Sequence, residues 1–214
     1  MKNVLILAAN GQIARIVEQR VLKEQPDVHL TLFLRNKERL SSLADNDYVT
    51  LVEGDMNNAA DVNQAMKGQN MAIIGVVDHT NDSRMTHNIV EAAKANGVNR
   101  IIQTNIGGIY DEVSGEFAEW NKQMVGDGIR TSRLSADVLE NSGLDYTILR
   151  LPWLNNRDLH YVITHKGQPF VGTSGSRASV ADVIVKIIAD PSFAKNDSIA
   201  ISDPDTKDAT RPVY

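Results

Sequence analysis

Short, continuous apolar segments alternate along this chain with longer segments in which apolar residues recur every three or four positions. The apolar segments lack the polar–apolar alternation of half-exposed strands, so they are interpreted as strands buried on both faces. The intervening segments have the period of amphipathic helices. This alternation predicts an α/β fold, a doubly wound parallel sheet with helices on both faces. Strands are expected at residues 3–8, 29–34, 49–53, 71–77, 100–104, 146–151 and 198–201.

Helix signals fill the gaps between these strands. Pro26 stops the first helical pattern, Asn81 or Asp82 is expected to cap the fourth helix, and Gly97 suits the position just after that helix ends. The other helices are expected at residues 13–21, 37–43, 59–67, 132–141 and 180–189. Because no repeat, linker or low-complexity segment interrupts the pattern, residues 1–214 are expected to form a single domain.

Residues 110–130 form the least regular part of the pattern. Phe117 and Trp120 look exposed there, and two glycines lie near the end of the segment. Two interpretations are open: a flap that covers a bound ligand, or a surface loop that its aromatic side chains pin to the body of the protein.

Composition excludes several classes of function. The net charge is −5 without a concentrated basic face, so nucleic acid is not expected as a partner. The chain contains no cysteine, and His160 and His165 have no partners at metal-ligand spacing, so no metal site is expected. No apolar run could span a membrane, and a cytoplasmic location is expected. A small-molecule substrate is therefore the expected partner, while a homodimer and a regulatory protein partner stay open.

The segment VLILAANGQIA at residues 4–14 leads from the first strand into the first helix. A dinucleotide-binding loop places three glycines here, for a tight turn, for close approach of the diphosphate and for helix–strand packing. The corresponding residues are Ala8, Gly11 and Ala14, and alanine at the first position requires that Ala8 keep a negative φ. An ordinary strand–helix turn would also use Asn10-Gly11, so both interpretations stand at this point.

Two further strand ends favour a nucleotide site. The second strand ends at Arg35-Asn36, where NAD-binding proteins usually carry an acidic residue for the ribose hydroxyls. A guanidinium at this place suits the 2′-phosphate of NADP, with NAD as the alternative, although a surface arginine paired with Glu38 or Asp45 would look the same. Asp55 follows the third strand, where its carboxylate could accept from the adenine amino group, cap the next helix, or do both.

With these residues in place, the chain resembles the NmrA-like, NAD(P)-binding members of the atypical short-chain dehydrogenase/reductase family, which have the Rossmann fold. The resemblance covers nearly the whole chain and rests on LILAANGQIAR, LFLRNKERL, VEGDM, NRIIQTNIGGIYDE, SADVLENSGLDYTILRLPWL and SRASVADVIVKII. It implies contacts with the cofactor from one set of residues: Gly11, Gln12 and Ile13 at the diphosphate, Arg35 and Asn36 at the 2′-phosphate, Asp55 and Met56 at the adenine, Val76 and Val77 at the adenine-side ribose, Thr104 and Asn105 at the nicotinamide ribose, and Pro152 and Trp153 near the nicotinamide.

Catalytic members of this family use a serine after the fifth strand and a Tyr-x-x-x-Lys motif on the next helix. This chain has no Tyr-x-x-x-Lys; Ile129 and Arg133 occupy the corresponding positions. Without this pair, Tyr110 and then His79 are the candidate proton donors, although both are also ordinary loop residues.

Three functions remain open. The first is an NADP-dependent oxidoreductase that transfers hydride to a small quinone, flavin or carbonyl, of which quinones and flavins need no strong general acid. The second is a regulatory protein that senses NAD(P) without turnover, and the third is an NAD-dependent epimerase or dehydratase.

Overall fold

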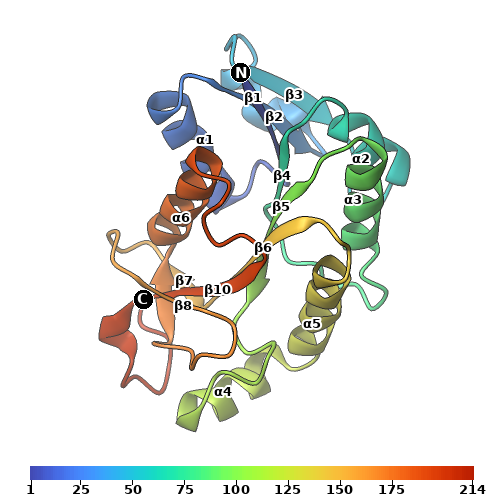
Figure 1. Ribbon diagram of the computed structural model, residues 1–214. Coiled ribbons are helices and arrows are strands. Elements are labelled where there is room, and N and C mark those ends of the chain that lie inside the picture. Colours follow the sequence, from blue (N-terminus) through green and yellow to red (C-terminus); the bar gives the residue numbers. More distant parts are fainter.

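Eight strands form one twisted sheet in the order β3-β2-β1-β4-β5-β6-β10-β8, and all are parallel except β8, which runs antiparallel to β10 (Figure 1). This is a computed structural model, and it describes all residues from 1 to 214. A separate parallel pair, β7 and β9, lies outside the sheet. The strands are β1 (Lys2–Leu7), β2 (Val28–Leu34), β3 (Val49–Glu53), β4 (Met71–Ile74), β5 (Arg100–Ile106), β6 (Asp145–Leu151), β7 (Trp153–Asn155), β8 (Val162–Thr164), β9 (Ser174–Ser176) and β10 (Asp197–Ser202).

Helices cover both faces of the sheet, which confirms the predicted doubly wound fold. Seen nearly edge-on, the sheet has α1 and α6 on one side and α2, α3 and α5 on the other (Figure 1). No helix has the length and apolar character needed to span a membrane. The helices are α1 (Gln12–Glu24), α2 (Ala59–Met66), α3 (Arg84–Ala95), α4 (Gly115–Val125), α5 (Asp127–Glu140) and α6 (Arg177–Ala189), with 3-10 helices η1 (Lys37–Leu43) and η2 (Pro204–Thr206).

The strand order reverses between β1 and β4. From β1 the chain adds β2 and β3 on one side, then crosses back to place β4 against the other side of β1. The connections that leave the carboxyl ends of β1 and β4 therefore turn to opposite faces. In doubly wound sheets, ligands bind in the crevice that forms at such a switch point.

The expected irregularity of residues 110–130 is wrong. Most of this segment is helical: α4 begins after Ser114, and α5 begins five residues earlier than predicted, at Asp127. The two helices meet at Gly126, whose φ of 36° breaks the helical path. Phe117 and Asn121 are the buried residues of α4, so its apolar stripe is too narrow to show as a clear period.

One of the two cap predictions for α3 also needs correction. The N-cap of α3 is Ser83, in a left-handed conformation with φ 48°, and not Asn81 or Asp82. Asp82 still contributes, since its carboxylate accepts from the Arg84 amide at 3.3 Å. At the other end of α3, Gly97 has φ 69° just after the C-cap, as the sequence predicts.

Candidate nucleotide-binding site

A cleft of about 600 Å³ opens at the carboxyl ends of β1, β2, β3 and β4, at the switch point of the sheet. Four connections supply its walls, one from the end of each strand. The residues that line it include Ala8, Asn10, Gly11, Arg35, Asn36, Arg39, Gly54, Asp55, Met56, Gly75, Val76 and Met85.

Gly11 stands where the floor of the cleft meets the start of α1. It has extended backbone, with φ −66°, and no side chain caps the helix. The first-turn amides of α1 therefore lack intrahelical acceptors and are available to an anion. A Cβ at position 11 would lie 3.3 Å from the Ala8 carbonyl oxygen and 3.7 Å from that of Gly75. Bare backbone at this point fits the close approach of a diphosphate.

The turn before Gly11 differs from the expectation. Ala8 has φ 62°, in the left-handed region, whereas the sequence argument required a negative φ. The turn is held by a hydrogen bond of 3.0 Å from the Gly11 amide to the Ala8 carbonyl, while the Ala9 amide donates to Phe33 on β2. Alanine thus adopts a conformation that glycine would adopt without cost.

Arginines gather at the end of the cleft beside β2. Arg35 and Arg39 both line it, and Arg35 forms no ion pair, so the predicted alternative of pairing with Glu38 or Asp45 is not realised. The Arg15 side chain donates to the Arg39 carbonyl at 2.8 Å, and this hydrogen bond connects α1 to the backbone of η1. Asn36 caps η1, since its side chain accepts from the Glu38 amide. Two guanidinium groups thus line this end of the cleft without forming an ion pair, which suits a phosphate group.

The third strand end supplies Gly54, Asp55 and Met56. A Cβ at Gly54 would come within 2.5 Å of the Phe33 ring, so only glycine fits beside β2. The predicted cap role of Asp55 is wrong, because Asn58 caps α2. The Asp55 carboxylate instead accepts from the Asn57 amide at 2.9 Å, which lowers the pKa of Asp55 and holds the loop.

The predicted cofactor residues after β4 and at the end of β5 differ in exposure to the cleft. Val76 lines the cleft, and Val77, a neighbour in sequence, does not. The Thr104 hydroxyl donates to the Ile74 carbonyl at 2.9 Å, and the Asn105 amide donates to the Ser132 carbonyl at 3.0 Å. Both side chains are buried and satisfied within the fold. Their predicted contact with a nicotinamide ribose remains a prediction.

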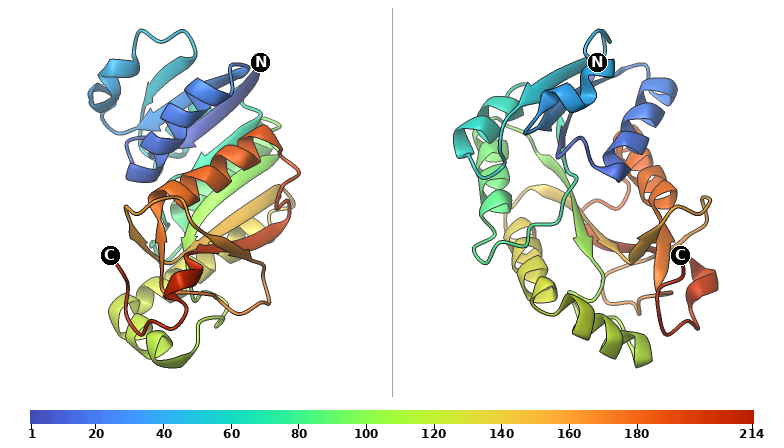
Figure 2. Two further views of the ribbon diagram at one scale, coloured as in Figure 1. Left: turned by 90° about the vertical axis from the view of Figure 1, so that its left-hand side faces the viewer. Right: turned by 180° about the vertical axis from the view of Figure 1, so that it is seen from behind.

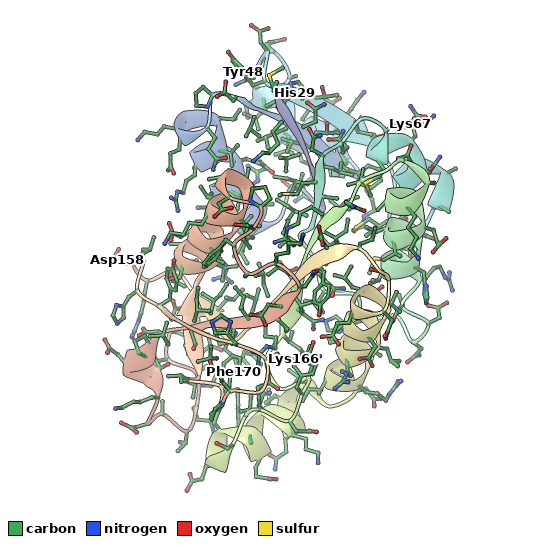
Figure 3. All side chains as sticks on the ribbon, viewed as in Figure 1. His29, Tyr48, Lys67, Asp158, Lys166 and Phe170 are labelled. Atoms are coloured by element: carbon green, nitrogen blue, oxygen red, sulfur yellow. The ribbon has the colours of Figure 1, made fainter.

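A second cavity, of about 350 Å³, lies at the carboxyl ends of β5 and β6 and is covered by α4. Its walls are mainly apolar and include four aromatic residues, Phe117, Trp153, Phe170 and Tyr214. Phe170, from the loop between β8 and β9, is labelled in Figure 3. Its ring packs on Gly107, where a Cβ would come within 2.7 Å of it. Pro152 and Trp153, predicted near the nicotinamide, line this cavity.

Asn121 of α4 is the buried amide of this cavity. The Trp153 indole Nε1 donates to Asn121 Oδ1 at 2.8 Å. Because an indole N–H can only donate, the amide orientation is fixed, and Asn121 Nδ2 is left without an acceptor in the protein. The aromatic residues of α4 pack against the body of the protein. Phe117 is buried, and the Trp120 ring lies 5.0 Å from the Trp153 ring between centroids. Of the two interpretations of residues 110–130, the pinned cover fits these contacts.

Tyr110 lies in neither cavity. Its hydroxyl donates to Glu140 at 2.6 Å, and burial together with this hydrogen bond raises the pKa of Tyr110. Arg133, at the position of the family's lysine, stacks on the Tyr110 ring and pairs with Asp137. His79 is exposed, and its Nδ1 lies 3.4 Å from the Ser132 hydroxyl. These contacts give Tyr110 a packing role and leave both proton-donor assignments as predictions.

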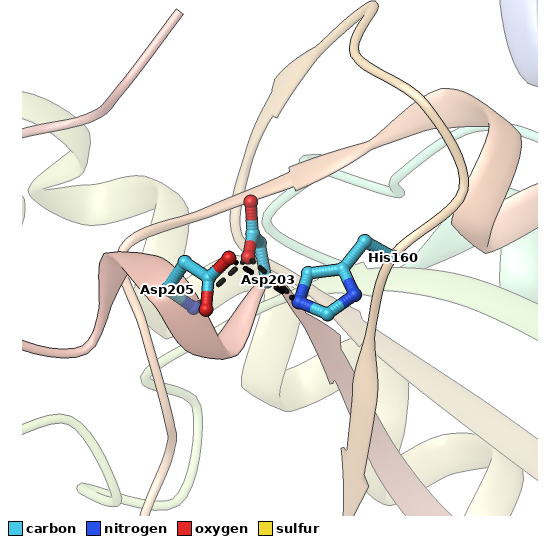
Figure 4. Close-up of side chains that lie close together, drawn as sticks. All are labelled: His160, Asp203 and Asp205. Carbon is cyan, nitrogen blue, oxygen red and sulfur yellow. Dashed lines mark hydrogen bonds and ion pairs between the residues drawn. The ribbon is translucent and has the colours of Figure 1, made fainter.

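The sequence argument also missed a cluster in the C-terminal part of the chain (Figure 4). His160 Nε2 lies 3.4 Å from an Asp205 carboxylate oxygen and 3.8 Å from one of Asp203. His160 and Asp205 are exposed, and Asp203 already accepts from the Asp205 amide as the cap of η2. The cluster shares no residue with either cavity and ties η2 to the loop before β8.

Residues from distant segments complete the two cavities. Arg39 could have been found, since it follows Arg35 in the same basic segment RNKER. Asn121, Phe170 and Arg177 carry no local signal, because each is brought to the second cavity by the fold alone.

Known proteins share this sequence pattern and this fold. Residues 8–191 match the family described as NAD(P)H-binding. A short-chain dehydrogenase/reductase from Veillonella parvula, solved in complex with NADP, is 28% identical over 100% of this chain and 99% of that chain, with a TM-score of 0.92. A Rossmann-fold NAD(P)-binding protein from Shigella flexneri is 32% identical over 100% of this chain and 99% of that chain, with a TM-score of 0.82.

A curated relative, quinone oxidoreductase 2 of Escherichia coli, is 25% identical over 157 residues, which are 73% of this chain and 50% of that protein. The chain thus spans about half the length of this relative. The resemblance expected from the sequence is confirmed by these matches. The chain belongs to the NAD(P)H-binding family and is an atypical short-chain dehydrogenase/reductase-like protein with a Rossmann fold.

Proposed function

We propose that this protein is an NADPH-dependent reductase that transfers hydride to a small, planar acceptor such as a quinone. The observation that carries the proposal is the apolar, aromatic cavity at the ends of β5 and β6, separate from the cationic cleft. A protein that only senses the coenzyme has no need of a second ligand cavity. The likeness to a quinone oxidoreductase supports the choice of acceptor.

The residues of the cleft fit the coenzyme. Backbone at Gly11 and the first-turn amides of α1 would hold the diphosphate. Arg35 and Arg39, which line the cleft without an acidic partner, would hold the 2′-phosphate and favour NADPH over NADH. Bound there, NADPH would supply a hydride to the acceptor.

The second cavity would orient the acceptor and exclude water. Aromatic rings of Phe117, Trp153 and Phe170 suit a planar molecule. The free Nδ2 of Asn121 would donate to an acceptor oxygen and so stabilise negative charge as it develops. A quinone that gains a hydride needs one further proton to become a hydroquinone, and solvent supplies it, so no tyrosine–lysine pair is required.

A steady-state assay tests the reductase proposal. NADPH is incubated with the protein and with menadione, a flavin or a simple ketone, while absorbance of the reduced nicotinamide is followed. The proposal predicts a protein-dependent fall in absorbance that is fastest with menadione. If calorimetry shows that NADPH binds but the absorbance stays constant with every acceptor, the reductase proposal is wrong.

One observation favours a second candidate, a coenzyme sensor that acts on a partner protein. The chain lacks the Tyr-x-x-x-Lys pair, and Tyr110 is engaged by Glu140 instead of facing a cavity. The same assay separates the two candidates, because a sensor binds NADPH without consuming it.

A further inference from the structure

We propose that the second cavity selects planar aromatic acceptors that carry an acidic group, and that Arg177 is the anchor for this group. The inference names the substrate class of the proposed reductase and therefore rests on that function for its meaning. It depends on one charged residue in an otherwise apolar and aromatic wall.

Arg177 is the only charged side chain that lines the cavity, and no aspartate or glutamate accompanies it. Tyr214, the last residue of the chain, also lines the cavity, and its main-chain oxygen accepts from Arg157 at 3.1 Å and not from Arg177. It lies at the first position of α6, whose first turn contains no acidic residue, and it forms no ion pair. Its Nη1 donates to the Asn156 side chain at 3.0 Å, which holds the guanidinium in place. The remaining N–H donors have no acceptor in the protein, although guanidinium groups pair readily with carboxylates.

The surroundings of Arg177 define the rest of the ligand. Trp153 and Phe170 supply flat apolar surface, and Asn121 Nδ2 is a second donor without a protein acceptor. A volume of about 350 Å³ is at the small end of the range for ligand cavities and favours two or three fused rings. The protein has a net charge of −5, so a guanidinium without an ion-pair partner in the wall of this cavity indicates that Arg177 recognises an anion.

The two tryptophans of the chain provide a direct probe of this cavity. Trp153 lines it and Trp120 packs against Trp153, so both indole N–H signals in an NMR spectrum report on ligand binding. Naphthoate and naphthamide are the ligands to titrate, since they have the same shape and differ in charge. Coenzyme is left out, so the result does not depend on hydride transfer.

In the wild-type protein, naphthoate is expected to shift the indole signals and to bind about tenfold more tightly than naphthamide. Arg177→Ala removes this preference, and Arg177→Lys keeps part of it because the charge remains. Arg130→Ala, which removes an exposed arginine of α5 outside the cavity, leaves the preference unchanged.

Three results would overturn the proposal. The first is that neither ligand shifts the indole signals. The second is that naphthoate and naphthamide bind equally well to the wild type. The third is that the preference for naphthoate survives in Arg177→Ala. Each of these results leaves the outcome of the menadione assay untouched, so a failure of this inference and a failure of the reductase proposal are distinguishable.

Discussion

Among single residues, Ala8 combines a left-handed backbone with a place in the wall of the nucleotide cleft. This conformation costs about 1–2 kcal/mol for a residue with a Cβ. Ala8→Gly removes that cost, but glycine also stabilises the unfolded chain by about 0.4–1 kcal/mol. The net prediction is that the free energy of unfolding rises by about 0.5–1 kcal/mol, measured by urea denaturation.

Ala9→Gly is the matched control for this prediction. Ala9 is fully buried and has no positive φ, so the same substitution there removes a packed methyl group and lowers stability. An Ala8→Gly variant that is destabilised as much as Ala9→Gly would mean that the backbone at position 8 carries no strain.

Asn121 is the residue whose chemistry the proposed reaction uses most directly. Asn121→Asp keeps an oxygen for the Trp153 indole but replaces the free Nδ2 donor with an acceptor. If Nδ2 stabilises the acceptor oxygen, kcat/KM for menadione falls by at least about tenfold. The affinity for NADPH stays unchanged, because Asn121 does not line the nucleotide cleft.

Gln123→Glu places the same extra charge on the exposed side of α4 and serves as the control. Its kcat/KM for menadione should equal that of the wild type. If Asn121→Asp is as active as the wild type and the indole signal of Trp153 is preserved, Asn121 Nδ2 does not stabilise the acceptor oxygen.

At the scale of elements, α1 carries a buried acid on the same face as Val17 and Val21. Burial raises the pKa of Glu18 from 4.5 to about 7, against an opposing effect of Arg15, and its Oε1 has no hydrogen-bond partner. Between these two pH values the folded protein holds a proton that the unfolded chain has lost. This residue's contribution to stability therefore falls as pH rises through that interval, by about 3 kcal/mol in all.

Glu18→Gln removes this dependence because glutamine does not titrate. Relative to the wild type, the variant should gain stability between about pH 5 and pH 8. Urea denaturation of both proteins at the two pH values measures the gain. A difference between the proteins that is the same at both pH values would show that Glu18 titrates normally.

The connection from β5 to α4 depends on a buried ion pair. Arg150 of β6 is fully buried and donates to Glu112 at 2.8 Å, and Glu112 also accepts from the Gly108 and Tyr110 amides. Burial alone would raise the pKa of Glu112, but the hydrogen bonds from Arg150 and Gly108 outweigh it and lower the pKa. The pair thus fixes the loop that leads into the cover of the second cavity.

Glu112→Gln leaves Arg150 charged and buried without a counterion. Loss of one partner of a buried pair costs about 3–5 kcal/mol. The urea midpoint should therefore fall strongly, whereas Asp137→Asn, which breaks the exposed pair with Arg133, should change stability by less than about 0.5 kcal/mol. Similar midpoints for the two variants would contradict a structural role for the buried pair.

For the molecule as a whole, the sequence predicts the sheet well and the second cavity poorly. Strands buried on both faces are continuous apolar runs, so β1, β2, β4, β5 and β6 can be recognised locally. The edge strand β3 is only partly buried, and its short, mostly apolar run VTLV marks it. Gly11 and Arg35 are recognisable for the same reason, since each lies in the connection that follows such a strand. The short β7, β8 and β9 carry too few residues for any period to appear.

The second cavity could not be predicted because the residues that line it come from unrelated segments. Asn121 belongs to α4, Phe170 to the loop between β8 and β9, and Arg177 to α6, and only the folded chain brings them together at this cavity. Figure 2 shows α4, in yellow-green, at the lower end of the molecule in both views. The position of Tyr110 after β5 makes it a candidate proton donor from sequence alone. Its engagement by Glu140, from the end of α5, depends on packing that no local pattern contains.

In the proposed function, the cleft at the switch point binds NADPH through the backbone at Gly11 and the guanidinium of Arg35. Isothermal titration calorimetry of NADPH and NADH tests it most directly. The wild type should bind one NADPH per chain at least about tenfold more tightly than NADH, and Arg35→Glu should abolish this difference by weakening NADPH. Absence of heat for both coenzymes, or equal affinities in the wild type, would contradict the claim.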